Sequence, residues 1–111
     1  MTSPERVAVI GCGLIGTSIA MAAVRAGDAV IGIETDARNA ATAADRAGIA
    51  VGSDLGSLSD ASIVVVATPI ASVPERVMDA LSMAPDATVT DVASVKATVL
   101  ADIGRRAANG R

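Results

Sequence analysis

Short apolar runs alternate along this chain with alanine-rich segments of helical length. Residues 7–10 (VAVI) and 63–67 (IVVVA) are continuous and rich in β-branched side chains, which is typical of strands buried on both faces of a parallel sheet. Two further strands are predicted at 29–33 and 88–92, and helices at 14–26, 36–47, 72–83 and 95–108. This alternation predicts an α/β protein with a doubly wound parallel sheet and right-handed crossovers.

Small and polar residues mark where these elements are expected to end. Gly27 and Gly48 follow predicted helices, and glycine readily adopts the left-handed conformation that closes a helix. Ser72 and Glu75 have the spacing of a capping box at the start of the third predicted helix. The stretch 49–60 is rich in glycine and serine, which predicts a short edge strand followed by a loop. No linker interrupts the pattern, so residues 1–111 are expected to form a single domain.

The composition narrows the functions that this chain can perform. Its 111 residues include no histidine, phenylalanine, tryptophan or tyrosine. Without an imidazole, the chain alone forms neither a Ser-His-Asp hydrolase site nor a histidine metal site, and no metal site is predicted. Without aromatic rings it lacks a stacking platform for nucleic acid, and its net charge of −3 also argues against a nucleic-acid partner.

The sequence also indicates a compartment. Cys12 is the single cysteine, so no disulfide can form within the chain, and the thiol is expected to be a small buried filler. The N-terminus lacks the apolar core of a signal peptide, and no apolar run approaches the roughly 20 residues that cross a bilayer. We therefore expect a cytoplasmic protein with no membrane partner.

A glycine-rich turn follows the first predicted strand. Residues 7–16 read VAVIGCGLIG and contain the pattern G-x-G-x-x-G between a strand and a helix. In a dinucleotide-binding turn, Gly11 would permit the tight turn, Gly13 would let the backbone approach a pyrophosphate, and Gly16 would let the helix pack closely on its strand. The phosphates would then meet free N–H groups at the positive end of that helix.

An acidic residue follows the second predicted strand. At this position the carboxylate of Glu34 can accept hydrogen bonds from both hydroxyls of an adenosine ribose, and it would repel a 2′-phosphate. The sequence therefore favours NAD as the cofactor over NADP. Arg38 lies one turn further on and could pair with a 2′-phosphate, although a solvated helix residue is the simpler interpretation.

Two further strand ends carry candidate site residues, because ligands of doubly wound sheets bind beyond the carboxyl ends of the strands. Thr68 and Pro69 follow the most apolar strand and would hold the chain extended beside a cofactor, or form an ordinary strand-to-helix turn. Asp91, Ser94 and Lys96 follow the last strand. Ser94 suits a helix cap and Lys96 a surface position, but neither role explains why polar groups crowd this strand end.

Three segments together resemble the prephenate dehydrogenase family, including its arogenate-using members. They are residues 11–20 (GCGLIGTSIA), 65–70 (VVATPI) and 90–96 (TDVASVK), in that order and spacing. The resemblance implies a Rossmann-type NAD-binding domain from an enzyme of tyrosine biosynthesis that oxidatively decarboxylates its substrate. The pyrophosphate contacts that it implies are Gly11, Gly13, Leu14, Ile15 and Gly16.

The resemblance also assigns roles to the other strand ends. It implies that Glu34 binds the adenosine ribose and that the nicotinamide half lies near Ala67, Thr68 and Pro69. Ser94 resembles the serine that hydrogen-bonds the catalytic histidine beside the substrate hydroxyl, which makes it the candidate catalytic residue. The resemblance gives Lys96 no assigned role.

The sequence departs from the family's pattern at its end. The family carries its catalytic histidine downstream in a His-Pro segment, followed by substrate-binding and dimer-forming helices, whereas this sequence ends at Arg111. We therefore expect a cofactor-binding portion, truncated before the C-terminal helical domain and inactive alone, that meets prephenate or arogenate only in a complete enzyme. The exposed strand at 88–92 would permit self-association through the sheet edge.

Two alternatives stay open. The chain could be a dinucleotide-binding sensor or partner module without catalysis. It could also be the cofactor domain of another β-hydroxyacid-type dehydrogenase, because those enzymes begin with a similar glycine turn. The combination of Asp91 with Ser94 and Lys96 argues against this last alternative.

Overall fold

The computed structural model describes residues 4–92 and 104–105 and contains alternating strands and helices. The helices and strands are, in chain order, β1 (Arg6–Ile10), α1 (Leu14–Arg25), β2 (Ala29–Ile33), α2 (Ala37–Ala47), β3 (Ala50–Gly52), the 3₁₀ helix η1 (Leu55–Asp60), β4 (Ile63–Val66), the 3₁₀ helix η2 (Ile70–Ser72), α3 (Val73–Met83) and β5 (Thr88–Asp91).

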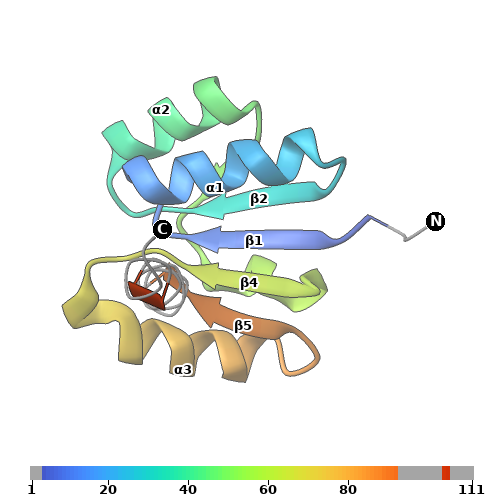
Figure 1. Ribbon diagram of the computed structural model, residues 1–111, viewed down its shortest axis with the longest axis vertical. Helices are drawn as coiled ribbons and strands as arrows, with labels where there is room; N and C mark the ends of the chain where they lie inside the picture. The colour runs from blue at the N-terminus through green and yellow to red at the C-terminus, as the bar shows by residue number, and fades with distance from the viewer. Residues whose placement is uncertain (1–3, 93–103, 106–111) are drawn as a thin grey trace.

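The strands form one parallel sheet in the order β3-β2-β1-β4-β5 (Figure 1). In the register, Val9 of β1 lies opposite Gly32 of β2 and Val65 of β4. From β1 the chain adds β2 and β3 on one side of the sheet, and it then crosses back to add β4 and β5 on the other side. This order confirms the predicted Rossmann-type α/β fold, and it brings the carboxyl ends of β1, β2 and β4 together at one edge.

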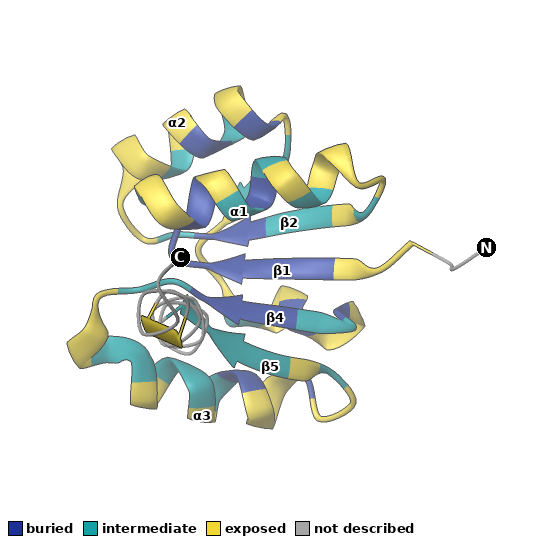
Figure 2. Cartoon of the chain, in the orientation of Figure 1, coloured by how far each residue is buried: buried dark blue, intermediate teal, exposed yellow. Residues whose placement is uncertain are grey.

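Helices cover both faces of the sheet, and alternate strand residues point to each face. The layer against α1 and α2 has a buried core of Val7, Val9, Ala20, Ala47 and Val65. The layer against α3 and η1 has a buried core of Ala8, Ile10, Ile33, Leu58, Ala61, Val64, Val66, Ala80 and Ala84. Figure 2 shows the buried residues gathered in the central strands. Burying each valine contributes about 1.5–3 kcal/mol, and the helical alanines let the helices lie close to the sheet.

Some of the observed helix ends agree with those predicted from the sequence. Gly48 closes α2 in the left-handed conformation with φ +66°, and Gly27 follows α1 with φ +90°. Asp36 caps α2 by accepting a 2.9 Å hydrogen bond from the Asn39 N–H, so this helix begins one residue later than predicted. Within the described part of the chain, no helix has the length and apolar character that crossing a membrane requires.

Two local predictions are wrong. Ser72 forms no side-chain cap for α3, because η2 leads directly into that helix and leaves Ser72 with helical backbone angles (φ −93°, ψ −11°) rather than extended ones. The segment after β3 is the 3₁₀ helix η1 rather than a loop, since Leu58 turns inward and is fully buried against α3. Ser94, Lys96 and most of the predicted helix at 95–108 lie outside the described residues.

β5 is the last strand of the described sheet on its side. Self-association through residues 88–92 stays a prediction, which a concentration series in sedimentation velocity would test.

Candidate functional site

A cavity of about 850 Å³ opens at the carboxyl edge of the sheet. At this edge α1 begins and the segment after β4 turns away from the sheet (Figure 1). Its lining comes from the ends of β1, β2 and β4 and from the segments that follow them. The lining residues are Ile10, Gly11, Gly13, Leu14, Ile15, Ile33, Glu34, Thr35, Asn39, Ser53, Leu55, Val66, Ala67, Thr68, Pro69, Ile70, Ser72, Val73, Arg76 and Val92.

Gly11 makes the turn from β1 into the glycine loop. Its φ of +92° is unfavourable for other residues, and its N–H donates a 2.8 Å hydrogen bond to the Ile33 carbonyl. A Cβ at this position would lie 2.8 Å from backbone atoms of both Ala67 and Thr68. Gly11 is therefore required both for the backbone conformation and for the close approach of the loop to the end of β4.

The other two glycines of the motif have opposite surroundings. Gly16 is buried, and a Cβ there would overlap the carbonyl oxygen of Gly11. Gly13 has an ordinary φ of −75°, and a Cβ there would meet no atom within 4 Å. Gly16 is thus needed for packing, whereas Gly13 leaves open space beside the start of α1, where a ligand can approach the backbone.

The first turn of α1 presents N–H groups to this space. Gly13 is the N-cap, and its carbonyl accepts the 2.9 Å hydrogen bond from the Thr17 N–H. The N–H groups before Thr17 therefore have no acceptor within the helix. The first turn contains no acidic residue, so the positive end of the helix dipole suits an anion such as a phosphate.

Glu34 fixes the second wall of the site. One carboxylate oxygen, Oε1, accepts a 2.8 Å hydrogen bond from the Cys12 N–H, and Oε2 accepts a 2.9 Å bond from the Asp36 N–H. The carboxylate thus joins the glycine loop to the start of α2. Each oxygen keeps further acceptor capacity, so the side chain can also receive hydroxyl donors from a ligand.

The third wall follows β4. The Ala67 N–H donates a 2.7 Å hydrogen bond to the Ile10 carbonyl, and Pro69 continues with extended backbone angles (φ −52°, ψ 145°). Between them, the hydroxyl oxygen of Thr68 is buried and has no hydrogen-bond partner among the described residues. A buried hydroxyl without a partner is costly, so this atom is suited to a polar group of a ligand.

The structure brings most of the predicted cofactor residues together. Eight of the nine line the cavity, and the ninth, Gly16, lies beneath the loop. Ser94 lies outside the described residues. The sequence interpretation missed Arg76, which also lines the cavity; a signal existed, because it lies three residues after Val73 and therefore on the same face of α3.

Cys12 is buried beneath the loop, as predicted. Its Sγ occupies the space beside Gly32, where a Cβ would lie 2.8 Å from the sulfur. Burial, and secondarily the charge of Glu34, raise the pKa of the Cys12 thiol above its ordinary value of 9.0. The thiol is therefore a neutral filler rather than a reactive thiolate.

We expect iodoacetamide to alkylate Cys12 in the native chain at pH 8.5 at least about tenfold more slowly than in urea, because burial and the raised pKa both suppress the reactive thiolate. The folded thiol holds its proton beyond the unfolded pKa of 9.0. The protonated thiol therefore contributes to the free energy of unfolding. This contribution is complete below pH 9 and is lost as the pH rises through the pKa of the thiol in the folded chain. Mass spectrometry measures the single adduct; equal rates in both states would contradict the assignment.

A glycine loop at a helix N-terminus, a carboxylate after the next strand and a 3-2-1-4-5 parallel sheet define a nucleotide-binding domain of the Rossmann type. The model of the family described as prephenate dehydrogenase, nucleotide-binding domain, matches residues 19–110. The chain belongs to this family. The match begins after the glycine-rich turn, so it depends on other parts of the sequence.

Solved structures agree with this assignment. Synechocystis arogenate dehydrogenase is 32% identical, with a TM-score of 0.71 over 78% of this chain and 32% of its own. A Corynebacterium glutamicum protein provisionally assigned as a prephenate dehydrogenase is 28% identical, with a TM-score of 0.63 over 78% of this chain and 29% of its own. Mycobacterium tuberculosis 3-hydroxyisobutyrate dehydrogenase is 28% identical, with a TM-score of 0.69 over 80% and 31%.

The chain therefore spans about a third of the length of these three structures. The comparison with curated protein sequences gives no match.

Proposed function

We propose that this chain binds NAD, in preference to NADP, as the cofactor portion of an enzyme that oxidatively decarboxylates prephenate or arogenate. The observation that carries the proposal is the convergence on one cavity of the open space at Gly13, the carboxylate of Glu34 and the hydroxyl of Thr68, which has no partner among the residues that the structure describes. These groups match a pyrophosphate, a ribose diol and a further polar group of a dinucleotide. The family supports the same class of ligand.

In this proposal each wall of the cavity binds one part of the cofactor. The N–H groups at the start of α1 would hold the pyrophosphate above Gly13, and Glu34 would accept hydrogen bonds from the adenosine ribose. The segment containing Ala67, Thr68 and Pro69 would lie along the nicotinamide half. When bound, NAD accepts the hydride, while the protein orients it and excludes water from the cavity.

The charges around the cavity support NAD over NADP. Glu34 would repel a 2′-phosphate at the ribose position. Arg76 is the only cation that lines the cavity in the described ranges, and it already pairs with Asp79 at 2.7 Å. Arg38 is exposed on α2 and is not part of the lining.

The rest of the chemistry requires groups that this sequence does not contain. The chain has no histidine, so we propose that it supplies cofactor binding and that any imidazole base acts from another segment or chain. Ser94 keeps its proposed role beside such a base, on the resemblance alone.

Changing Glu34 to alanine should weaken NAD binding by about tenfold and NADP binding by less, because only NAD loses a charge-assisted contact to the ribose and only NADP is relieved of repulsion at its 2′-phosphate. Titration calorimetry measures both affinities, since a chain without aromatic residues has no useful intrinsic fluorescence.

Two further variants serve as controls. Glu34→Gln keeps an acceptor oxygen for the Cys12 N–H and removes only the charge, so it should shift the NAD to NADP ratio in the same direction with less effect on folding. Asp45→Ala removes an exposed carboxylate from α2 and should change neither affinity. An equal loss for both dinucleotides in Glu34→Ala would remove Glu34 from the ribose contact.

A further inference from the structure

Arg76 lines the same cavity as the glycine loop. It lies in the first turn of α3, three residues after Val73, and its side chain is 33% exposed. Val73 and Leu55 pack against the buried core to which Ile33 belongs, and all three residues line the cavity. The guanidinium is therefore only partly exposed, in a cavity that these apolar residues also line.

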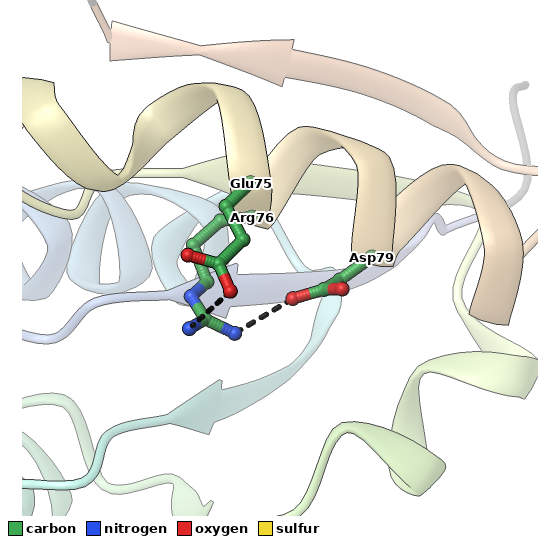
Figure 3. A network of polar contacts seen from close by, with 3 residues as sticks. All are labelled: Glu75, Arg76 and Asp79. Carbon is green, nitrogen blue, oxygen red and sulfur yellow. Dashed lines mark hydrogen bonds and ion pairs between the residues drawn. The ribbon is translucent and has the colours of Figure 1, made fainter.

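Two carboxylates of the same helix hold the guanidinium. Its Nη1 donates a 2.7 Å hydrogen bond to Asp79, and its Nη2 lies 3.8 Å from Glu75 (Figure 3). Both contacts use the edge of the planar group and leave its faces available. Because one positive charge lies between two negative ones, this position offers little net attraction for a phosphate.

A dinucleotide bound at Gly13 and Glu34 would have its adenine base near Arg76. In the adenosine half, the base is attached to the ribose on the side opposite the carbon that carries the pyrophosphate. With the pyrophosphate at Gly13 and the ribose at Glu34, the base extends away from the glycine loop. The cavity that contains Gly13 and Glu34 is also lined by Ser53, by Leu55 and by residues at the start of α3, which offer a place for such a base.

A purine base in this part of the cavity needs a flat or apolar surface on each side. The chain has no aromatic residue with which the base could stack. Among the described lining residues, the Arg76 guanidinium is the only planar cation, and guanidinium planes stack favourably on aromatic rings. Leu55, Ile33 and Val73 supply the apolar surface beneath.

We infer that the guanidinium of Arg76 stacks on the adenine base of the dinucleotide, with Asp79 as the positioning residue that orients its plane. The inference rests on the proposed function, and it adds a contact that recognises the base rather than the phosphates or the ribose.

The test is a calorimetric titration of the full chain and its variants with NAD, ADP-ribose and nicotinamide mononucleotide. Arg76→Ala and Arg76→Lys should both weaken NAD and ADP-ribose by about 5- to 30-fold, because lysine keeps the charge but lacks the plane. Nicotinamide mononucleotide has no adenine, so its affinity should not change. Asp79→Asn should weaken NAD and ADP-ribose by about two- to fivefold through a less ordered Arg76.

Arg46→Ala, which removes an exposed cation from the last turn of α2, is the matched control and should bind all three ligands as the parent chain does. Far-UV circular dichroism checks that each variant folds, and Arg76→Lys decides the question if Arg76→Ala unfolds. Failure of the parent chain to bind NAD would refute the proposed function itself. NAD binding that Arg76→Lys leaves unchanged, or an equal loss for nicotinamide mononucleotide, would overturn the stacking contact alone.

Discussion

Replacing Gly13 by aspartate should weaken NAD binding by at least about 100-fold, which corresponds to about 2.7 kcal/mol, while the fold stays as stable as before or becomes more stable. The new side chain would enter the open space beside α1, since a Cβ there meets no atom within 4 Å. At the N-cap its carboxylate would accept a helix N–H and complement the dipole, contributing about 1 kcal/mol to stability. The same carboxylate would displace and repel the pyrophosphate.

The opposite signs of the two effects make this variant informative. Urea unfolding followed by far-UV circular dichroism measures the stability, and calorimetry measures the affinity. Gly13→Ala fills part of the same space without charge, so it should give a smaller loss of affinity and a slightly less stable helix. Wild-type affinity in Gly13→Asp would place the pyrophosphate elsewhere.

Replacing Gly16 by alanine should lower the free energy of unfolding by about 3 kcal/mol or more. In an open helix this change would add about 1 kcal/mol of helix propensity. Here the new Cβ overlaps the carbonyl oxygen of Gly11 and lies 3.3 Å from the Cβ of Ala67. Because the first of these atoms belongs to the backbone of a tight turn, α1 must move away from the sheet, and overpacked sites cost about 1–3 kcal/mol even when side chains can adjust.

Gly52→Ala is the comparison for this effect. Gly52 ends β3 and has open space at its Cβ position, so its replacement should change the free energy of unfolding by less than about 0.5 kcal/mol. Chemical denaturation of both variants gives the values. If Gly16→Ala is as stable as Gly52→Ala, the close contact between α1 and the glycine loop does not constrain the fold.

Local sequence patterns correctly predict the strands and turns that depend on residues close to one another in the sequence. The β-branched run at 63–67 appears as β4, and the run at 29–33 is β2 with the same bounds. The glycine spacing predicts the turn at Gly11 and the close packing at Gly16, because both depend on the absence of a Cβ within one strand-turn-helix unit. These features need no information about distant parts of the chain.

Two of the three errors arise where distant segments meet. Leu58 belongs to a stretch that resembles a loop in composition, and only its burial against α3 makes that stretch an ordered 3₁₀ helix. Ser72 has the spacing of a cap, but the preceding turn has already set its backbone. Arg76 resembles an ordinary surface residue of a helix, and only the folded structure shows that it lines the same cavity as the end of β2. For Leu58 and Arg76 tertiary packing overrides a plausible local signal, whereas for Ser72 the adjoining 3₁₀ helix η2 does so.

The two hydrogen bonds that the Glu34 carboxylate accepts from backbone N–H groups would complicate a change of cofactor. A protein engineer who wished to switch this domain to a 2′-phosphorylated cofactor would first remove that carboxylate. The same substitution would also release the Cys12 and Asp36 N–H groups and loosen the turn that cradles the phosphates. Cofactor preference and the geometry of the glycine loop therefore both depend on the Glu34 side chain. A change of cofactor would need a second substitution that restores an acceptor for the Cys12 and Asp36 N–H groups.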